Sequence, residues 1–192
     1  ANRVSVAGLD YLALGDWHGT LQVHDRAWYS GTPEPDRFKN NDPGNVLLVE
    51  LDGSGAVPRV EKVRVAHTRW VEHEATVHSD EDVTVLSEWV GGVESPTNTL
   101  VRLTLDGALS FEGSGRLDTL LTQWGNLFLL LKREGEIRTA ATAEELAAIA
   151  TAGPVKTAAD RLAAIAGGAT VQAGDAALAL KMLHGIAAGG VA

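Results

Sequence analysis

The segment SDEDVTVLSEWVGG (79–92) decides how the middle of the chain is organised. It begins with a serine and three acidic residues and ends with two glycines, which are typical start and stop signals of an amphipathic helix. The stretch before it, TRWVEHEATV (68–77), alternates polar and apolar residues, as a strand with one exposed face does. We therefore expect a strand followed by a helix over 68–92.

The same order of elements continues downstream. TLVRLTLDG (99–107) predicts a strand, and GRLDTLLTQWGN (115–126) has apolar residues at helical spacing. LFLLLKREGEIRTA (127–140) predicts a further strand, or a hairpin that turns at Glu134-Gly135. This βαβαβ order predicts an α+β domain over 67–140 with its helices on one face of a sheet.

The last part of the chain, residues 141–192, is rich in alanine. TAEELAAIATAG (142–153) opens with a Thr-x-x-Glu capping box, a signature of a helix start. TAADRLAAIAGG (157–168) and AGDAALALKMLHGIAAGG (173–190) are further helix candidates that end in glycine. We expect a helical C-terminal region that packs against a larger body.

The first part, residues 1–66, reads as short strands and loops. LDYLALG (9–15) is apolar and closed by glycine, which predicts a buried strand that is central in a sheet. RAWYSG (26–31) predicts a second strand, and GTPEPDRFKNNDPG (31–44) predicts a loop. The remainder, 45–65, predicts a β-hairpin with a GSG turn and a half-exposed second arm.

Composition limits the classes of function. The chain has 192 residues, a net charge of −9 and no cysteine, so we expect neither a disulfide framework nor a thiolate metal site. No part of it carries an excess of lysine and arginine, which argues against tight nucleic-acid binding by the chain alone. No window has the length of apolar sequence that a membrane span needs, and we expect a cytoplasmic protein.

The sequence GDWHG (15–19) contains the chemistry that most needs an explanation. Along an extended backbone residues i and i+2 project to the same side, so Asp16 and His18 are expected to converge. A carboxylate and a neutral imidazole are good ligands for Mn²⁺, Fe²⁺ or Zn²⁺. The alternative is a hydrogen-bonded Asp–His pair at the end of a strand.

The surroundings of this motif resemble a known family. DYLALGDWHG (10–19), WYSGTPEPDRF (28–38) and GNVLLVELDG (44–53) are similar, in this order, to the calcineurin-like metallophosphoesterases, in particular the DNA-repair exonuclease (SbcD-like) branch. The resemblance covers residues 8–52 and is weaker beyond. It implies that 1–66 is the C-terminal portion of a metallophosphoesterase β-sandwich, a strand plus a hairpin.

By the same resemblance the domain over 67–140 is a small capping domain that helps to select the substrate, and 141–192 is its helical tail. The family's Gly-His-x-His motif gives one histidine to each of two metals, and His18 matches one of them. Asp16 stands where the other histidine is usual, which would change that metal's preference. The resemblance implies two divalent ions, with manganese favoured over iron or zinc.

The other ligand motifs of the family are not found in this chain, so the resemblance implies the C-terminal part of a longer phosphoesterase. Two ions held about 3.5–4 Å apart need more ligands than one aspartate and one histidine. We therefore expect no complete set of catalytic residues in this chain and no hydrolysis by it alone. We expect Trp17 and Arg37 to contact the substrate; Lys39 is a second candidate for phosphate.

Other histidines and tryptophans have simpler interpretations. His67, His73 and His78 lie in or beside the predicted strand at 68–77, where a solvated face is favoured over a metal site. Trp89 and Trp124 fall on the apolar faces of predicted helices and are expected in the core.

Two functions follow as hypotheses. In the first, the parent protein is a metal-dependent hydrolase, an exonuclease-like phosphodiesterase that acts on DNA or on small nucleotides. In the second, the region is a non-catalytic module that docks a partner, such as an ATPase subunit, or another copy of itself. An exposed apolar stripe on the helices of 157–190 would favour the second hypothesis.

Overall fold

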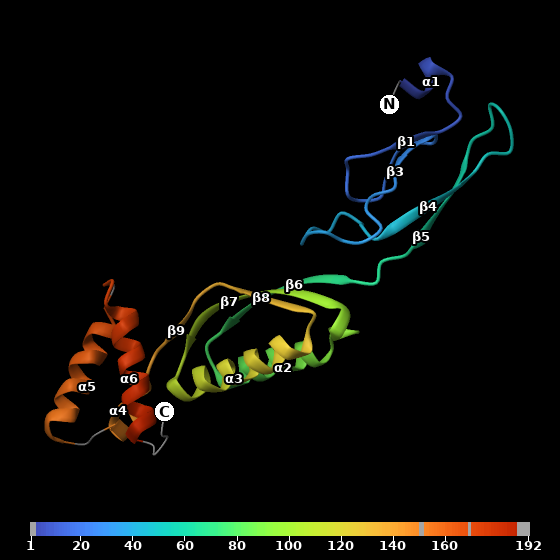
Figure 1. The fold of residues 1–192 in the computed structure, drawn as a ribbon. Coiled ribbons are helices and arrows are strands. Elements are labelled where there is room, and N and C mark those ends of the chain that lie inside the picture. Colours follow the sequence, from blue (N-terminus) through green and yellow to red (C-terminus); the bar gives the residue numbers. More distant parts are fainter. Residues whose placement is uncertain (1–2, 150–151, 169, 188–192) are drawn as a thin grey trace. The chain divides into compact units, whose positions relative to one another are not determined.

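The computed structural model describes residues 3–149, 152–168 and 170–187, and its fold is mixed α+β (Figure 1). The chain divides into two compact units. The first contains Ala1–Glu72 and Thr97–Arg102, and the second contains His73–Pro96 and Leu103–Ala192. The division that we predicted, at 66 and at 140, places its boundaries elsewhere, and the helical tail belongs to the second unit.

The first unit contains two small sheets. The secondary structure elements in chain order are α1 (Arg3–Ala7), β1 (Leu12–Leu14), β2 (Leu21–His24), β3 (Ala27–Tyr29), β4 (Asn45–Glu50) and β5 (Arg59–Arg64). One sheet has the order β1-β3-β2, with β1 parallel and β2 antiparallel to β3. The predicted hairpin is confirmed as β4 and β5, which pair from Asn45 opposite Arg64 to Glu50 opposite Arg59.

The prediction that LDYLALG forms a buried, central strand is wrong. Strand β1 lies at the edge of its three-stranded sheet, Leu12 and Leu14 are only partly buried, and Ala13 is exposed. A short apolar run has the same appearance in a half-exposed strand as in a buried one, because periodicity cannot be read from three residues. Strand β2, which interrupts the expected connection to β3, was not predicted.

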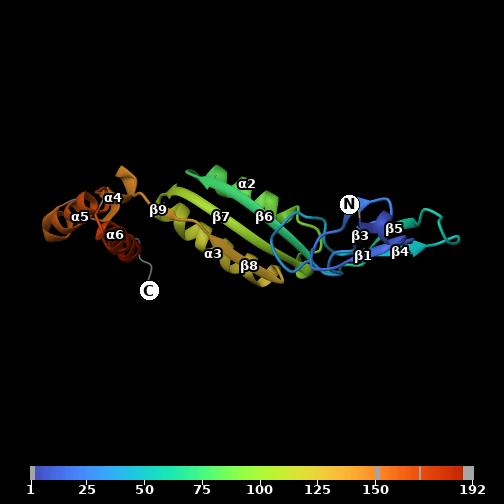
Figure 2. The same ribbon diagram turned by 90° about the horizontal axis from the view of Figure 1, so that it is seen from above.

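The second unit contains the predicted βαβαβ order. The elements are β6 (Arg69–Val77), α2 (Asp80–Gly91), the 3₁₀ turn η1 (Pro96–Asn98), β7 (Thr99–Leu109), α3 (Phe111–Leu127), β8 (Leu130–Glu134) and β9 (Ile137–Thr139). The boundary between the two units falls within β6 and β7. Helices α2 and α3 both lie on one side of the sheet β6-β7-β8, as the sequence predicted (Figures 1 and 2).

The core of this unit follows from alternation along β7. Leu103 and Leu105 are fully buried beneath the helices, and Val83 and Leu86 of α2 are buried with them. Residues i and i+2 of a strand face the same side, so the alternating leucines give one continuous apolar face. Trp124 of α3 is 5 % exposed, which confirms its prediction as a core residue.

The predicted hairpin at Glu134-Gly135 is absent from the described part of the chain. Strand β9 pairs in parallel with β7, Gly107 opposite Ile137, instead of folding back on β8. Gly135 has a φ of +84°, and a Cβ there would lie 2.3 Å from the Leu105 carbonyl oxygen. Only glycine fits this close approach. Glu134-Gly135, which resembled a hairpin turn in the sequence, is therefore an irregularity between strands β8 and β9 where they pass along β7.

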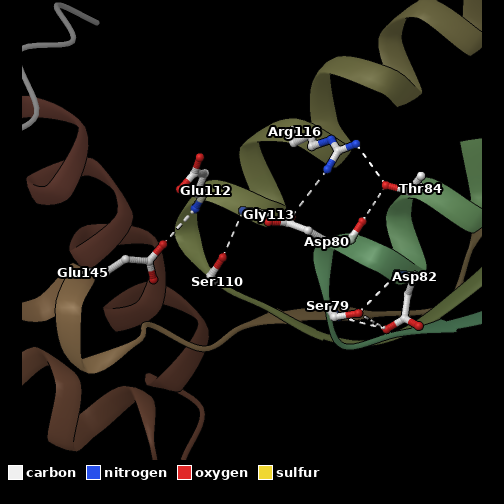
Figure 3. A network of polar contacts seen from close by, with 9 residues as sticks. All are labelled: Ser79, Asp80, Asp82, Thr84, Ser110, Glu112, Gly113, Arg116 and Glu145. Atoms are coloured by element: carbon white, nitrogen blue, oxygen red, sulfur yellow. Dashed lines mark hydrogen bonds and ion pairs between the residues drawn. The ribbon is translucent and has the colours of Figure 1, made fainter.

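Helix α2 is capped at Ser79, where the sequence indicated its start, whereas α3 begins at Phe111, before the predicted 115–126, with a cap at Ser110 that was not predicted (Figure 3). The Ser79 hydroxyl accepts a hydrogen bond from the Asp82 amide, and the Asp82 carboxylate accepts one from the Ser79 amide in return. At the start of α3, Ser110 accepts from the Gly113 amide. Such caps each contribute about 1 kcal/mol to helix stability.

Three helices close the second unit: α4 (Ala143–Ile149), α5 (Gly153–Ala166) and α6 (Ala173–Ala187). Their core contains Phe111, Ile149, Ala159 and Leu180. The predicted capping box is confirmed, because Thr142 and Glu145 exchange hydrogen bonds of 2.9 and 3.1 Å. None of the helices in the described residues is long and apolar enough to cross a membrane.

Candidate functional site

The Gly-Asp-Trp-His-Gly segment follows β1, but its backbone is not extended. Asp16 has a φ of +77°, the left-handed conformation that aspartate adopts more readily than most residues. The extended-strand argument for the convergence of Asp16 and His18 therefore does not apply to this backbone. Asp16 is exposed and His18 is partly buried. Ligation by Asp16 stays a prediction, now without its geometric argument.

The position of His18 is fixed by its backbone. The His18 carbonyl oxygen accepts hydrogen bonds from the Thr32 amide, at 3.0 Å, and from the Thr32 hydroxyl, at 3.2 Å. Gly31 has a φ of +78°, and a Cβ there would lie 2.8–2.9 Å from backbone atoms of His18, Gly19 and Thr20. Two chain segments thus touch through their backbones, which only glycine at this position allows.

On the other side of His18, the loop 33–44 closes over Gly19. A Cβ on Gly19 would lie 1.7 Å from the Asn41 carbonyl oxygen. The Thr20 amide donates to the Asp42 carbonyl oxygen at 2.9 Å, and the buried Asn45 side chain donates to the same oxygen at 3.0 Å. The loop that sequence analysis could only describe as irregular is therefore held rigidly against the motif.

Asp36 in this loop orients His18. Its Oδ2 atom lies 2.6 Å from Nδ1 of His18, and Arg37 donates to both carboxylate oxygens at 3.0 and 3.1 Å. These hydrogen bonds, that from Arg37 foremost and then that from His18, lower the pKa of Asp36 from 3.8 to about 2. An ionised carboxylate at 2.6 Å accepts the proton of Nδ1, and in the neutral imidazole the lone pair then lies on Nε2.

Arg37 also approaches His18, with Nη2 lying 2.9 Å from Nδ1. A hydrogen bond from Arg37 needs an unprotonated Nδ1 as its acceptor, whereas a hydrogen bond to the Asp36 carboxylate needs Nδ1–H as its donor. The shorter distance and the full charge of the carboxylate favour Nδ1–H donating to Asp36. The guanidinium is then a neighbour of His18 that is held through the shared carboxylate.

Trp17 reaches the same loop. Its side chain is 42 % exposed, and the Lys39 Nζ atom lies 4.9 Å from its ring centroid, within the range of a cation–π contact. The structure thus brings Trp17, His18 and Arg37 together on one loop.

An open cleft of about 490 Å³ adjoins this loop within the first unit. Four cationic residues line it, together with two aromatic residues: Arg37, Lys39, Arg64, Arg69, Phe38 and Trp70. Sequence analysis named Arg37 and Lys39 but missed the other four. The signal available was the basic and aromatic pattern of DRFK (36–39) and TRW (68–70), which the net charge of −9 obscured.

The described residues contain no group of three or more His, Asp or Glu side chains that could hold a metal ion. His18 could give one bond, through Nε2, and its orienting carboxylate is in place. Carboxylate–histidine pairs of this kind are the usual second layer of a metal site. They also occur as plain hydrogen-bonded pairs, the alternative stated from the sequence.

The other histidines do not join this site. His73 is partly buried and stacks on Trp89, with ring centroids 3.9 Å apart and planes at 9°. Burial lowers the pKa of His73, so its predicted place on a solvated face is wrong. His67 and His78 are exposed, as expected of a solvated face.

Comparison with known proteins adds no assignment to this geometry. No protein-family model matches the chain, and the search of curated proteins gives no match either.

Proposed function

We propose that the first unit supplies His18 to a dimetal phosphoesterase site, as a DNA exonuclease-like phosphodiesterase would require. The observation that carries this proposal is the His18–Asp36 pair, in which Nδ1 lies 2.6 Å from the carboxylate, so that Nε2 of the neutral imidazole would be the atom that offers a lone pair to a metal. The resemblance of residues 8–52 to the calcineurin-like metallophosphoesterases supports it. The further ligands would lie outside the described residues, and the activity would be cytoplasmic.

The residues of this chain fit a metal of borderline hardness. Imidazole nitrogen suits Fe²⁺ and Zn²⁺, and an oxygen ligand such as the exposed Asp16 carboxylate would be needed to favour Mn²⁺. When bound, divalent ions supply Lewis-acid activation of water and of the phosphoryl oxygens. Asp36 orients His18 through Nδ1, and the hydrogen bonds from Arg37 lower the pKa of Asp36 to about 2. The domain over 67–140 would select the substrate.

The test uses the whole product of the coding sequence that includes these residues. We expect Mn²⁺-dependent hydrolysis of bis(p-nitrophenyl) phosphate and of single-stranded DNA, lost in His18→Ala. Asp36→Asn should reduce metal affinity by about 10- to 100-fold, as losses of orienting carboxylates do. His67→Ala, an exposed histidine of the same unit, is the matched control.

Two results would contradict the proposal. One is an unchanged rate and metal affinity in His18→Ala of the whole protein. The other is Mn²⁺-dependent hydrolysis by residues 1–192 alone that survives His18→Ala. If residues 1–192 alone hydrolyse the substrate and His18→Ala abolishes this activity, His18 remains a metal ligand but the need for ligands from outside these residues is refuted.

A second function, partner docking or self-association, is favoured by the surface of α6. Leu178, Met182 and Ile186 are 58, 60 and 66 % exposed. Their spacing of four residues places them on one face of the helix, opposite the buried Ala176 and Leu180. This is the apolar stripe that the sequence hypothesis required, and a row of exposed apolar side chains is a common mark of a protein interface.

The test is sedimentation velocity at increasing protein concentration. We expect a mass increase that Leu178→Glu together with Met182→Glu abolishes. Val85→Glu on α2 is the matched control, since Val85 is also 58 % exposed. A monomer at every concentration, with no ATPase partner retained by the unmodified chain, would refute this second function.

A further inference from the structure

The cleft beside the 33–44 loop has more positive charge than the composition of the chain suggests. Its two acidic lining residues, Asp42 and Glu72, are both paired with cations that do not line it. Asp42 accepts from Lys62 at 2.8 Å, and Glu72 pairs with Arg102. Arg37 on the lining is likewise paired, with Asp36, so an anion site here rests on Lys39 and Arg64.

Two of these cations are held in place without a carboxylate. Arg64 donates to the Pro43 carbonyl oxygen at 2.8 Å, and its Cζ packs on Gly44, where a Cβ would lie 3.0 Å away. Lys39 contacts the ring of Trp17. In the part of the chain that the structure describes, neither side chain has a carboxylate within 4.0 Å. Arg64, whose guanidinium is held by the Pro43 carbonyl, is thereby preorganised for an external anion, and Lys39 adds a more flexible charge to the same lining.

The wall of the cleft adds an aromatic surface. Trp70 and Phe38 meet edge to face with ring centroids 4.8 Å apart, and the Arg102 guanidinium lies 4.8 Å from the Phe38 centroid. These contacts lock the two rings in position. Cations beside aromatic rings are the combination that nucleotides require, because the phosphate pairs with charge and the base stacks. The volume of about 490 Å³ lies in the range of small-molecule sites.

We propose that this cleft binds a nucleotide, with the phosphate at Lys39 and Arg64 and the base against Trp70. The ligand is either a free mononucleotide or one unit of a single strand, which share this chemistry. The inference deepens the proposed function, since it names the substrate class beside His18. Binding here requires no metal, so the two proposals can fail separately.

The experiment is isothermal titration of residues 1–192 with dAMP, with the oligonucleotide d(A)6 and with inorganic phosphate, in EDTA at 50 and 200 mM salt. We expect dAMP to bind more tightly than phosphate, and binding to weaken with salt. Arg64→Gln should weaken dAMP binding at least 10-fold. Arg59→Gln, on the same strand and with the same loss of charge, should change it less than 2-fold.

The aromatic contribution has its own variant. Trp70→Leu should reduce the affinity for dAMP to that for phosphate. If this variant does not fold, Trp70→Phe replaces it, because phenylalanine keeps a ring against Phe38, and its affinity for dAMP should lie between the affinities of the unmodified protein for dAMP and for phosphate. His67→Ala, at an exposed histidine of the same unit, should leave dAMP binding in EDTA unchanged. A higher affinity for d(A)6 than for dAMP identifies the ligand as a unit of a strand; equal affinities identify a free nucleotide.

The proposal is overturned if neither dAMP nor d(A)6 binds at 1 mM. It is also overturned if Arg59→Gln weakens binding as much as Arg64→Gln does, because the attraction would then be non-specific surface charge.

Discussion

Replacing Gly19 by alanine tests whether the loop over the Gly-Asp-Trp-His-Gly segment is as tightly held as its backbone contacts indicate. The new Cβ would lie 1.7 Å from the Asn41 carbonyl oxygen, so the loop must retreat by about 1.3 Å to reach even a tight contact of 3.0 Å. The hydrogen bond from Thr20 to Asp42 is 2.9 Å long and would break. Overpacking costs about 1–3 kcal/mol and a lost backbone hydrogen bond about 1 kcal/mol, so we expect a loss of about 2–4 kcal/mol.

Hydrogen exchange of the amides of Thr20, Thr32 and Gly44 measures this loss directly, because all three donate to backbone carbonyls around the loop. A loss of about 2–4 kcal/mol corresponds to roughly 30- to 900-fold faster exchange. Gly15→Ala is the matched control, since no atom lies within 4 Å of its Cβ and its φ is not positive. Exchange in Gly19→Ala that equals exchange in Gly15→Ala would refute the packing argument.

Three further predictions concern single side chains. Burial lowers the pKa of His73 from 6.5, so as the pH falls the unfolded chain binds a proton before the folded chain does. The contribution of His73 to the free energy of unfolding should therefore be complete above pH 6.5 and decrease below it. His73→Phe, which keeps a ring stacked on Trp89, should remove that decrease when urea titrations at about pH 7.5 and 5.5 are compared. Arg37→Ala should raise the pKa of Asp36 from about 2 toward 3.8 in a carboxyl NMR titration; an unmoved midpoint would show that the Arg37 hydrogen bonds are absent in solution. Leu103→Ala should cost about 2–5 kcal/mol of unfolding free energy by urea denaturation, because the side chain is fully buried; a cost below 1 kcal/mol would place it outside the core.

Long periodic segments could be predicted from the sequence and short ones could not. Helix α2 and strand β7 each show their period over ten or more residues, and caps such as that at Ser79 mark their starts. Strand β1 has three residues, too few for a period to separate an edge strand from a central one. A glycine such as Gly135 is equally compatible with a hairpin turn and with a close approach of two backbones. The sequence cannot distinguish the two, because the Leu105 backbone that approaches Gly135 is distant in the chain.

Only part of the candidate site could be predicted: the residue types are visible in the sequence, but their arrangement in space is not. Trp17, His18 and Arg37 could be named because their chemistry is visible in the letters. Their arrangement could not be predicted, because it depends on the left-handed backbone of Asp16 and on glycines that admit a neighbouring chain. Arg64 and Arg69 reach the cleft through strand pairing and loop closure, which no local pattern encodes.

The loop links the two proposals through one carboxylate. Asp36 accepts from both His18 and Arg37, so a ligand that draws Arg37 into the cleft removes hydrogen bonds that lower the pKa of Asp36. A metal on Nε2 of His18 acts in the opposite direction, since it makes Nδ1–H a stronger donor to Asp36. If both ligands bind as proposed, metal and nucleotide binding would be coupled through Asp36, and the coupling would be reciprocal. Its size is the difference between the nucleotide affinities measured with and without metal in the whole protein, and Asp36→Asn should abolish that difference.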